Sequence, residues 1–511
     1  MIKTVGIIGA GFAGLSTAKV LKSFGFKVTV FEKELDVGGV WAASRRYPGL
    51  TTQNPRTTYA LSDFPMPRDY PEWPSGEQVQ AYLQRYTEHF DFAQDILLGT
   101  AVESAAFNEA PAQWTVASVR GCGAAQERTV RSFDYLIVCN GIFSEPAVPA
   151  YPGVDEFVAA GGRVCHTSQF NQLQDAHGKH VLVVGYGKSS CDVANATVDV
   201  SRSTTVLARH LIWKIPKKFM NVLNFKFLLL TRMGEALFKY IELSGVEKFL
   251  HGTGLPIRNA MLGSVESVVN RQLRLDKIGL HPGTKLETIA RSTVSLVTDG
   301  FYEKVAAGRL KVMKGATITR LSAGQAELST GATLPADIVV CGTGWQQRVP
   351  FLSAEVMKRV TDGRGNFRLY RSLLPVDTPR LAFNGYNSSF FSQLNCEIGA
   401  LWLADHLLGG LDLPPRAEQI AMIDKRLAWM EERTDGKHSK GTNIIPFSVH
   451  NIDELLLDMK LPLGALTRFK QWLNPIAPGD YCVVARRLAK RHAAAWPRRP
   501  EGKSLASIRT P

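Results

Sequence analysis

Residues 2–41 read IKTVGIIGAGFAGLSTAKVLKSFGFKVTVFEKELDVGGVW, and this stretch decides the fold. Its first seven residues form a short apolar run, rich in β-branched side chains, which is typical of a buried parallel strand. A glycine-rich turn follows, and apolar residues then recur at helical spacing as far as Gly25. Residues 27–31 predict a second strand, which stops at Glu32. This order predicts a dinucleotide-binding unit of the Rossmann type, with a parallel α/β sheet.

Three glycines and one acid carry the expected binding chemistry. Gly9 allows the tight turn, Gly11 lets the backbone approach a pyrophosphate, and Gly14 lets helix and strand pack closely. The helix N-terminus offers free N–H groups and a positive dipole end to the phosphates. Glu32 is placed to accept hydrogen bonds from a ribose diol, and it would repel a 2′-phosphate. The alternative is a glycine-containing turn without a ligand, for which this ordered context is unusual.

The residues after Glu32 narrow the choice of cofactor, because they complete the pattern ExxxxxGGxW with Gly38, Gly39, Val40 and Trp41. With this pattern the chain resembles the flavin-containing monooxygenase family, the class B flavoprotein monooxygenases, in which the segment wraps the FAD pyrophosphate and leads under the flavin ring. The resemblance implies that the first site holds FAD through Gly9, Gly11, Phe12, Ala13, Gly14, Glu32, Lys33, Gly39, Val40 and Trp41.

Length and composition predict a soluble globular protein of two or three structural units, because 511 residues are ample for a large core. The most apolar stretch, residues 219–230, is too short to span a bilayer, and the immediate first strand predicts no signal peptide. Seven cysteines without a CxxC pair indicate a reducing, cytoplasmic location and no disulfide framework. The lack of a CxxC pair also argues against a dithiol reductase with two nucleotide sites.

The net charge of +14 is concentrated at the C-terminus, because residues 481–511 carry eight Lys or Arg and one acid. This composition predicts a frayed, solvated tail or a weak contact with an anionic surface, including a peripheral membrane contact. No aromatic interleaving or nucleic-acid fold signature accompanies the charge, so no nucleic-acid partner is expected.

Asn54 is the candidate catalytic residue. It lies in a turn-rich loop, residues 45–55, which is followed by an Asp-Phe-Pro segment at 63–65. In the family a loop of this kind places the amide beside the reactive edge of the flavin, where it could donate to a peroxide oxygen without changing charge. The alternative is an Asx turn before Pro55. After this loop, helical spacing is expected over 76–92, and short strands over 96–98, 113–116 and 133–138.

The linker pattern FxGxxxHxxx(Y/F) is a family fingerprint, and Gly162, His166 and Phe170 fit it, although Ala160 replaces the first Phe. Type I Baeyer–Villiger enzymes normally carry Trp at the last position, so Phe170 speaks against that class. The resemblance implies a structural role for His166 at the hinge between two nucleotide domains. The chain reaches this linker through Cys139-Asn140-Gly141, where the family usually has Ala-Thr-Gly.

The opening pattern then recurs, which predicts a second nucleotide site in the same chain. A strand at 179–184 leads into Gly185-Tyr186-Gly187-Lys188-Ser189-Ser190, and the next strand, 204–208, ends at Arg209 rather than an acid. An Arg at that position suits the 2′-phosphate of NADPH, unless it is only a surface Arg at a strand end. Trp213 and Lys214 could assist by stacking and charge. The NADPH site is expected at Gly185, Gly187, Lys188, Ser189, Ser190 and Arg209.

Residues 337–345 resemble the second family junction, and Gly344 and Trp345 are expected at the cofactor. A final helix from about Cys396 to Leu408, with Asn395 as a possible cap, is expected to aim its N-terminus at the flavin pyrimidine. The least familiar block is a helical insertion at about 215–280. It could cover the active site, bury a homodimer contact or rest on a membrane surface.

Together these motifs predict an α/β flavoprotein with two Rossmann-like domains. FAD would occupy residues 1–150 and 335–430, and NADPH residues 151–334, with 431–511 as a C-terminal wrap and basic tail. The implied activity is that of an NADPH- and O₂-dependent monooxygenase, an oxidoreductase that oxygenates an amine nitrogen or thioether sulfur of a small-molecule substrate through a C4a-(hydro)peroxyflavin. Alternatives are a Baeyer–Villiger monooxygenase acting on a ketone, an NADPH oxidase, or a redox-responsive flavoprotein partner.

Overall fold

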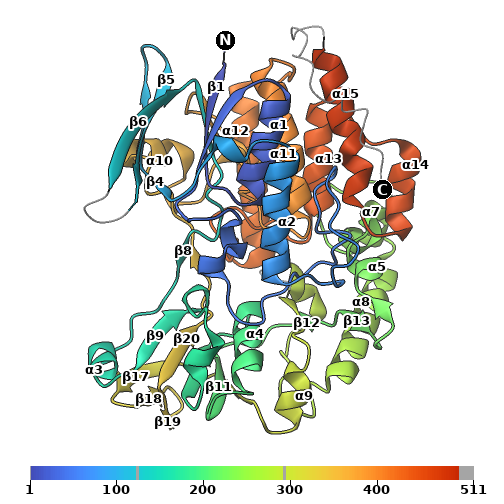
Figure 1. The fold of residues 1–511 in the computed structure, drawn as a ribbon. Coiled ribbons are helices and arrows are strands. Elements are labelled where there is room, and N and C mark those ends of the chain that lie inside the picture. The colour runs from blue at the N-terminus through green and yellow to red at the C-terminus, as the bar shows by residue number, and fades with distance from the viewer. Residues whose placement is uncertain (1, 122–125, 292–294, 494–511) are drawn as a thin grey trace.

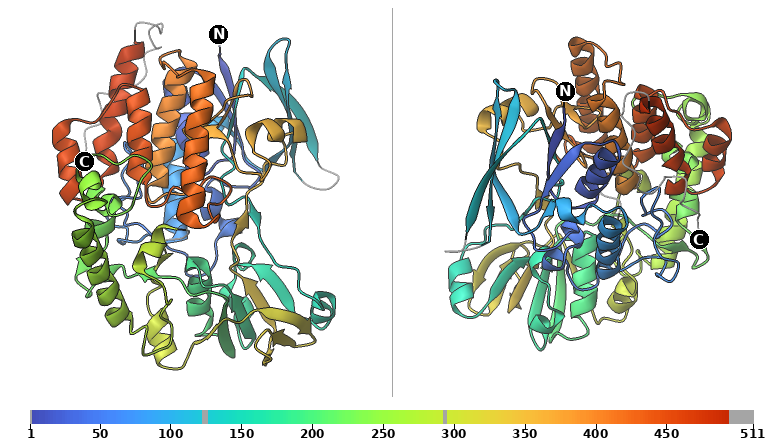
Figure 2. Two further views of the ribbon diagram at one scale, coloured as in Figure 1. Left: turned by 180° about the vertical axis from the view of Figure 1, so that it is seen from behind. Right: turned by 45° about the horizontal axis from the view of Figure 1, so that its top comes forward.

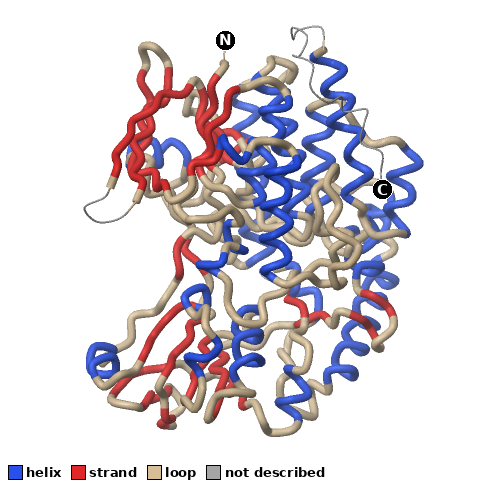
Figure 3. The backbone as a smooth tube through the Cα atoms, viewed as in Figure 1, coloured by secondary structure: helices blue, strands red, loops and turns tan. Residues whose placement is uncertain are grey.

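The fold contains two parallel five-stranded sheets, with a helical region alongside both (Figures 1 and 3). This arrangement is seen in a computed structural model, which describes residues 2–121, 126–291 and 295–493. The sheet that contains the opening strand lies in the upper part of Figure 1, and the second sheet lies below it. The α/β fold class predicted from the sequence is confirmed.

The first sheet has the strand order β24-β7-β1-β2-β3, and every neighbouring pair is parallel. Helix α1 follows β1 directly and packs against the last helix of the expected flavin unit, α11, while α2 lies beside α1. The bounds of these elements are β1 (Thr4–Ile8), α1 (Phe12–Ser23), β2 (Lys27–Phe31), α2 (Gly76–His89), β3 (Ile96–Leu97), β7 (Tyr135–Val138), β24 (Leu381–Phe383) and α11 (Ser392–Leu407).

An antiparallel meander of three strands branches from this unit: β4 (Thr100–Asn108), β5 (Gln113–Arg120) and β6 (Glu127–Phe133). The sequence analysis missed β4 and placed residues 133–138 in one strand. The structure ends β6 at Phe133 and begins β7 at Tyr135, on different sheets. Strands β4 and β6 are rich in polar, exposed residues, so they lack the apolar run that marks a buried strand.

The second sheet has the order β16-β11-β10-β20-β9, again all parallel. Strand β20 pairs with both β10 and β9, so it belongs to the second sheet. The boundary expected at residue 335, where the chain would return to the first unit, is therefore placed too early, because it precedes β20. The elements of this unit are α3 (Val154–Ala159), β9 (Arg163–His166), β10 (His180–Val184), α4 (Lys188–Thr197), β11 (Ser203–Ala208), α9 (Phe301–Ala306), β16 (Lys311–Lys314), β17 (Ile318–Ser322), β18 (Gln325–Leu328), β19 (Thr333–Pro335) and β20 (Ile338–Cys341).

The insertion at about 215–280 contains short strands as well as helices, and it packs against the C-terminal helices (Figure 2). Arg232 makes a bidentate ion pair with Asp453, at 2.6 and 3.0 Å, which ties the two segments together. The insertion comprises β12 (Lys214–Ile215), β13 (Lys218–Phe219), β14 (Leu223–Asn224), α5 (Lys226–Leu229), α6 (Arg232–Ala236), α7 (Gly245–Leu250) and α8 (Leu255–Leu273).

The C-terminal region differs from the expected frayed tail. Helix α15 (Cys482–His492) buries Val484 and Leu488, and Arg491 pairs with the buried Asp405 at 2.9 Å. Residues 494–511 of the tail lie outside the described residues. The other helices of this region are α12 (Arg416–Thr434), α13 (Ser448–Asp458) and α14 (Ala465–Leu473). No helix within the described ranges is long and apolar enough to cross a membrane.

The expected N-cap of α11 is also corrected. The helix begins at Ser392, so Asn395 lies inside its first turn. The Asn395 amide donates to the Phe391 carbonyl at 3.0 Å and accepts from Asn451 of α13 at 2.8 Å, so this buried side chain pairs with the start of its own helix and with a neighbouring helix. The remaining elements are β8 (Glu145–Pro146), β15 (Ser295–Leu296), β21 (Trp345–Gln346), α10 (Ala354–Val360), β22 (Leu369–Tyr370) and β23 (Leu374–Pro375).

Candidate functional site

The first glycine turn joins β1 to α1 with backbone that a side chain would obstruct. Gly9 has φ +108°, and a Cβ there would lie 2.5 Å from the Cys139 carbonyl oxygen. A Cβ at Gly14 would lie only 1.8 Å from the Gly9 carbonyl oxygen. The close packing of helix and strand therefore requires glycine at both positions.

Gly11 is different, because its surroundings are open. A Cβ there would meet only Gly39 of the GGxW segment, at 3.6 Å, an ordinary contact. Gly11 is also the N-cap of α1, and no side chain caps that end, so the first N–H groups of the helix are available to a ligand. Gly11 and Gly39 thus form a cradle that side chains would fill and that suits a pyrophosphate.

Glu32 lies at the carboxyl end of β2, as expected, and is buried. Its carboxylate accepts hydrogen bonds from the backbone N–H of Ala10, at 2.7 Å, and of Glu34, at 3.0 Å. Burial raises the pKa of this carboxyl, and the two backbone donors oppose that rise. The carboxylate is therefore fixed beside the glycine turn. The neighbouring Lys33 is exposed.

Aromatic side chains from three segments gather next to this turn. Tyr59 makes edge contacts with Phe12, at 5.6 Å between ring centroids, and with Trp41, at 5.7 Å. Gln393, in the first turn of α11, lies in the same region, because Gln393 and Trp41 both hydrogen-bond to the Tyr59 side chain. Burial raises the pKa of Tyr59. Gln393 is 2% exposed, and its Oε1 has no hydrogen-bond partner within the described part of the chain.

Asn54 is 3% exposed and donates from Nδ2 to the Phe390 carbonyl oxygen at 2.6 Å. This contact places its amide within one turn of the start of α11. The preceding residue, Gln53, accepts a hydrogen bond from the backbone N–H of Leu296 at 3.0 Å, on the side of the second unit. The adjacent pair Gln53 and Asn54 therefore joins the two units.

The second glycine turn repeats the geometry of the first. Gly185 has φ +111°, and a Cβ at Gly187, the N-cap of α4, would meet nothing within 4 Å. Ser190 takes the third glycine position, and its hydroxyl donates to the Gly342 carbonyl at 3.3 Å. A Cβ at Gly342 would lie 1.9 Å from the Ser190 Oγ. Gly342 therefore leaves room for the Ser190 side chain.

Lys188, in the first turn of α4, pairs with the buried Asp192 one turn later. Asp192 also accepts hydrogen bonds from the Thr298 hydroxyl and from Tyr47 of the first unit, the latter at 3.3 Å. The loop that contains the expected catalytic Asn54 is thus anchored on the second nucleotide unit. Ser189 is partly exposed beside this cluster.

Arg209 is exposed at the carboxyl end of β11 and makes no hydrogen bond or ion pair with any residue that the structure describes. Its guanidinium is therefore available to a ligand. The suggested assistance by Trp213 and Lys214 is wrong. Trp213 is buried and donates to the Thr284 carbonyl at 2.7 Å, and buried Lys214 donates to the Ser295 hydroxyl at 3.0 Å.

The two junctions between the units meet around Trp345. His166 lies 4.6 Å from the Trp345 ring, and its Nε2 is 2.9 Å from the Gly344 carbonyl oxygen. The Arg45 guanidinium lies over the indole, 4.7 Å from its centroid. Burial lowers the pKa of His166. The neutral ring links the linker to the second junction, as expected of a hinge residue.

Several residues at this site had no role in the sequence analysis. Gln53 adjoins Asn54, so its position along the chain was an available signal. Tyr47 meets Asp192, and Gln393 meets Tyr59, only through tertiary packing, and no spacing rule connects the members of either pair. The expected FAD residues lie along the first glycine turn, at the carboxyl end of β2 and in the GGxW segment, and the expected NADPH residues lie along the second glycine turn and at the carboxyl end of β11.

The residues present fit FAD at the first turn. The open cradle at Gly11 and the uncapped end of α1 suit its pyrophosphate, and the fixed Glu32 carboxylate suits a ribose diol. The unpaired Gln393 Oε1 is a buried acceptor, and a flavin pyrimidine carries an N–H donor. The fold and these two glycine turns define a flavoprotein with two dinucleotide-binding units.

Residues 2–461 match the sequence family described as flavin-binding monooxygenase-like, so the chain belongs to that family. It is an FAD-dependent monooxygenase that uses NADPH, and thus an oxidoreductase. One relative is the probable flavin-containing monooxygenase 1 of Arabidopsis thaliana, which is 27% identical over 93% of this chain and 96% of its own length.

Two solved structures share the fold. The S-allyl-L-cysteine S-oxygenase of Allium sativum is 19% identical with a TM-score of 0.62, covering 97% of this chain and 94% of its own. An oxidised steroid monooxygenase bound to NADP is 20% identical with a TM-score of 0.66, covering 90% of this chain and 98% of its own. At these identities the likeness concerns the fold.

Proposed function

We propose that this monooxygenase oxygenates a soft nucleophile, an amine nitrogen or a thioether sulfur, in a cleft between the two units. FAD is held at the first glycine turn and NADPH at the second. Bound flavin supplies the reduction of O₂ and the transfer of one oxygen atom. The observation that carries the proposal is the position of Asn54, which contacts the first unit at Phe390 while Gln53 contacts the second at Leu296.

The chain itself supplies positioning and exclusion of water. The Asn54 amide has two N–H donors, and one of them is used by the Phe390 carbonyl. The other donor and the amide oxygen are fixed in a buried place, where they can hold a reacting oxygen without adding a charge. The uncapped first turn of α11 lies beside them and presents the positive end of a helix dipole to a flavin that becomes anionic on reduction.

The insertion closes this region from the outside. Glu72 accepts a hydrogen bond from Asn224 of β14, and Lys217 lies 5.0 Å from the ring of Trp73. These contacts join the loop after Asn54 to the insertion, which supports a covering role over the site. A dry, enclosed site favours oxygen transfer over release of hydrogen peroxide.

Amine or sulfur oxygenation is favoured over Baeyer–Villiger chemistry by Phe170, which is completely buried where type I Baeyer–Villiger enzymes normally have Trp. The likeness to the Allium sativum protein named as an S-oxygenase also supports amine or sulfur oxygenation. We further propose a cytoplasmic location, in agreement with the free thiols of the six described cysteines.

The test is a comparison of product and peroxide across a panel of amines, thioethers and ketones. Wild type is expected to couple NADPH consumption to an N-oxide or sulfoxide. Asn54→Leu should keep its FAD and its anaerobic reduction by NADPH but release hydrogen peroxide instead of product, because the amide is lost while the bulk is kept. Asn54→Asp, which keeps the shape, controls for packing.

Two results would overturn parts of this proposal. Lactone or ester formation from ketones, without any oxygenated amine or thioether, would favour the Baeyer–Villiger alternative. Equal coupling in wild type and Asn54→Leu would leave the activity in place and remove the role assigned to Asn54.

A further inference from the structure

A cavity of about 480 Å³ lies at the opposite end of the first sheet from the glycine turn. Ile2, Tyr135 and Leu381, which line it, stand at or just before the amino ends of β1, β7 and β24. These strand ends lie near the N-terminus in Figure 1, on the side of the first unit away from the second sheet. A five-residue strand spans about 17 Å, so the cavity is remote from the pyrophosphate cradle.

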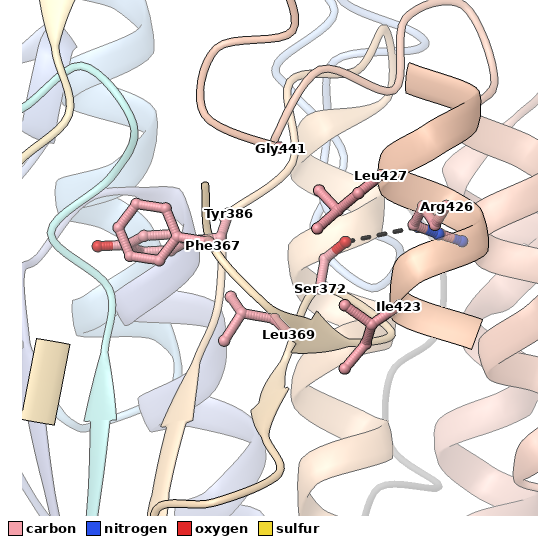
Figure 4. Close-up of a pocket in the computed structure, with 8 residues that line it drawn as sticks. All are labelled: Phe367, Leu369, Ser372, Tyr386, Ile423, Arg426, Leu427 and Gly441. Carbon is pink, nitrogen blue, oxygen red and sulfur yellow. Dashed lines mark hydrogen bonds between the residues drawn. The ribbon is translucent and has the colours of Figure 1, made fainter. Parts of the chain in front are cut away.

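The volume is within the range of small-molecule sites, roughly 300–1,000 Å³. By contrast, the cavity between Leu369, Tyr386 and α12 has only about 10 Å³ (Figure 4), which is room for one water molecule. The larger cavity is walled mainly by aliphatic side chains from three segments of the chain, and these are Ile2, Leu374, Pro375, Val376, Leu381, Leu407 and Leu413.

Two polar side chains inside this apolar wall lack hydrogen-bond partners. Thr378 is 7% exposed, and its Oγ1 has no partner among the described residues. The half-buried His406 makes ring contacts with Trp402, at 5.7 Å, and with Tyr135, at 6.5 Å, but its ring nitrogens make no hydrogen bond to any described residue. Burial lowers the His406 pKa, so its ring is neutral and can donate one hydrogen bond. The unpaired hydroxyl of the buried Thr378 is costly, and a ligand that pairs with it would gain that free energy.

The charged side chains at the cavity favour binding of an anion. Arg416 is neutralised by Asp377, at 2.7 Å. Arg380 instead donates to a neutral partner, the Ala112 carbonyl, and pairs with no carboxylate of the described chain. A guanidinium retains further N–H donors after one hydrogen bond, so Arg380 can bind a carboxylate at the edge of the apolar wall.

We propose that this cavity binds a small amphipathic carboxylate, whose apolar body lies against the aliphatic wall and whose carboxylate pairs with Arg380. The Thr378 hydroxyl and the His406 ring supply additional donors. The proposal does not depend on which nucleophile the enzyme oxygenates. Helix α11 connects the two places, since it runs about 21 Å from Gln393 at the flavin end to Leu407 at the cavity.

The test is calorimetric titration of octanoate into the FAD-loaded full chain with NADP⁺ at saturation, so that both nucleotide sites are filled. Octanoate is expected to bind with one site per chain. Octanamide, which has the same shape without the charge, should bind at least about tenfold more weakly, because it loses a charge-assisted pair. Inorganic phosphate should not compete, because it has no apolar body.

Substitutions at the cavity test whether octanoate binds there. Arg380→Gln should weaken octanoate about tenfold or more, whereas Arg364→Gln, at an exposed arginine elsewhere in the same unit, should leave it unchanged. Since Arg380 also holds the Ala112 carbonyl, Leu407→Trp is the second variant, because it fills the cavity without touching the arginine. No binding at millimolar octanoate, equal affinity for octanamide, or unchanged affinity in Leu407→Trp would each overturn the proposal.

Discussion

Gly11 and Gly14 stand one helical turn apart, but an added methyl group has different consequences at the two positions. At Gly11 it would enter open space and touch only Gly39, at 3.6 Å. At Gly14 it would collide with the Gly9 carbonyl oxygen. Gly11 therefore leaves room for the ligand, whereas Gly14 is needed for the close packing of helix and strand. The glycine pattern alone does not make this distinction.

Gly11→Ala is expected to lower FAD affinity at least about tenfold, because its methyl group occupies the place where the pyrophosphate approaches. The thermal stability of the FAD-free protein should stay close to that of wild type. FAD content after purification and a flavin-binding titration measure the effect. Gly14→Ala is the matched control and should destabilise the chain itself. Full flavin content in Gly11→Ala would show that the site is misassigned.

Arg209→Ala is expected to raise the KM for NADPH about tenfold or more and to leave that for NADH nearly unchanged. The reason is that only NADPH carries the 2′-phosphate with which this free guanidinium can pair. Steady-state rates with both coenzymes measure the difference. Arg202→Ala, at the amino end of the same strand, is the control for charge alone. Equal effects on both coenzymes would contradict the assignment.

At the scale of elements, the insertion and the C-terminal helices are joined by buried charges. His450 of α13 contacts Glu247 of α7 at 2.6 Å, and its other ring nitrogen lies 3.6 Å from Glu235 of α6. Burial by itself would lower the His450 pKa, but the close contact with Glu247 and the charges of the two carboxylates outweigh it and raise the pKa to about 10. His450 is therefore cationic at neutral pH and holds the two segments together.

This ion cluster predicts a pH-dependent contribution to stability. Because the folded pKa of His450 lies above its ordinary value of 6.5, the stabilisation is fully present below that value and is lost as pH rises toward about 10. The stability difference between wild type and His450→Gln should shrink by about 1–2 kcal/mol between about pH 7 and about pH 10. Urea unfolding across this range measures it. A difference that is constant or grows with pH would contradict the cationic assignment.

The parts of the fold that were predictable depend on local patterns. Both dinucleotide turns, the strands beside them and helix α2 follow from glycine spacing and apolar runs within about 40 residues. Strand β4 has no local signal because most of its residues are exposed and it lacks a buried apolar run, and the partner that places Asn395 inside its helix, Asn451, lies far along the chain. The packing of Arg232 on Asp453 likewise has no local signal.

At the scale of the whole molecule, the candidate site is assembled from both units and the insertion. The sequence could indicate each glycine turn and, with the family resemblance, Asn54. It could not indicate that Gln53 binds Leu296 or that Tyr47 binds Asp192, since these pairs depend on how the two units are placed. The cavity lined by Tyr135 and Leu381 also has no sequence motif, because its wall comes from four separate segments.

The central claim, oxygen transfer from O₂ to an amine or thioether, is tested most directly with isotopic oxygen. A thioether oxidised by the holoenzyme and NADPH under ¹⁸O₂ should give a sulfoxide that carries one labelled oxygen atom, with one NADPH consumed per product and one labelled atom released as water. Mass spectrometry of the product and a parallel NADPH assay measure both quantities. Unlabelled product, or complete conversion of NADPH to hydrogen peroxide with every amine, thioether and ketone offered, would contradict the account.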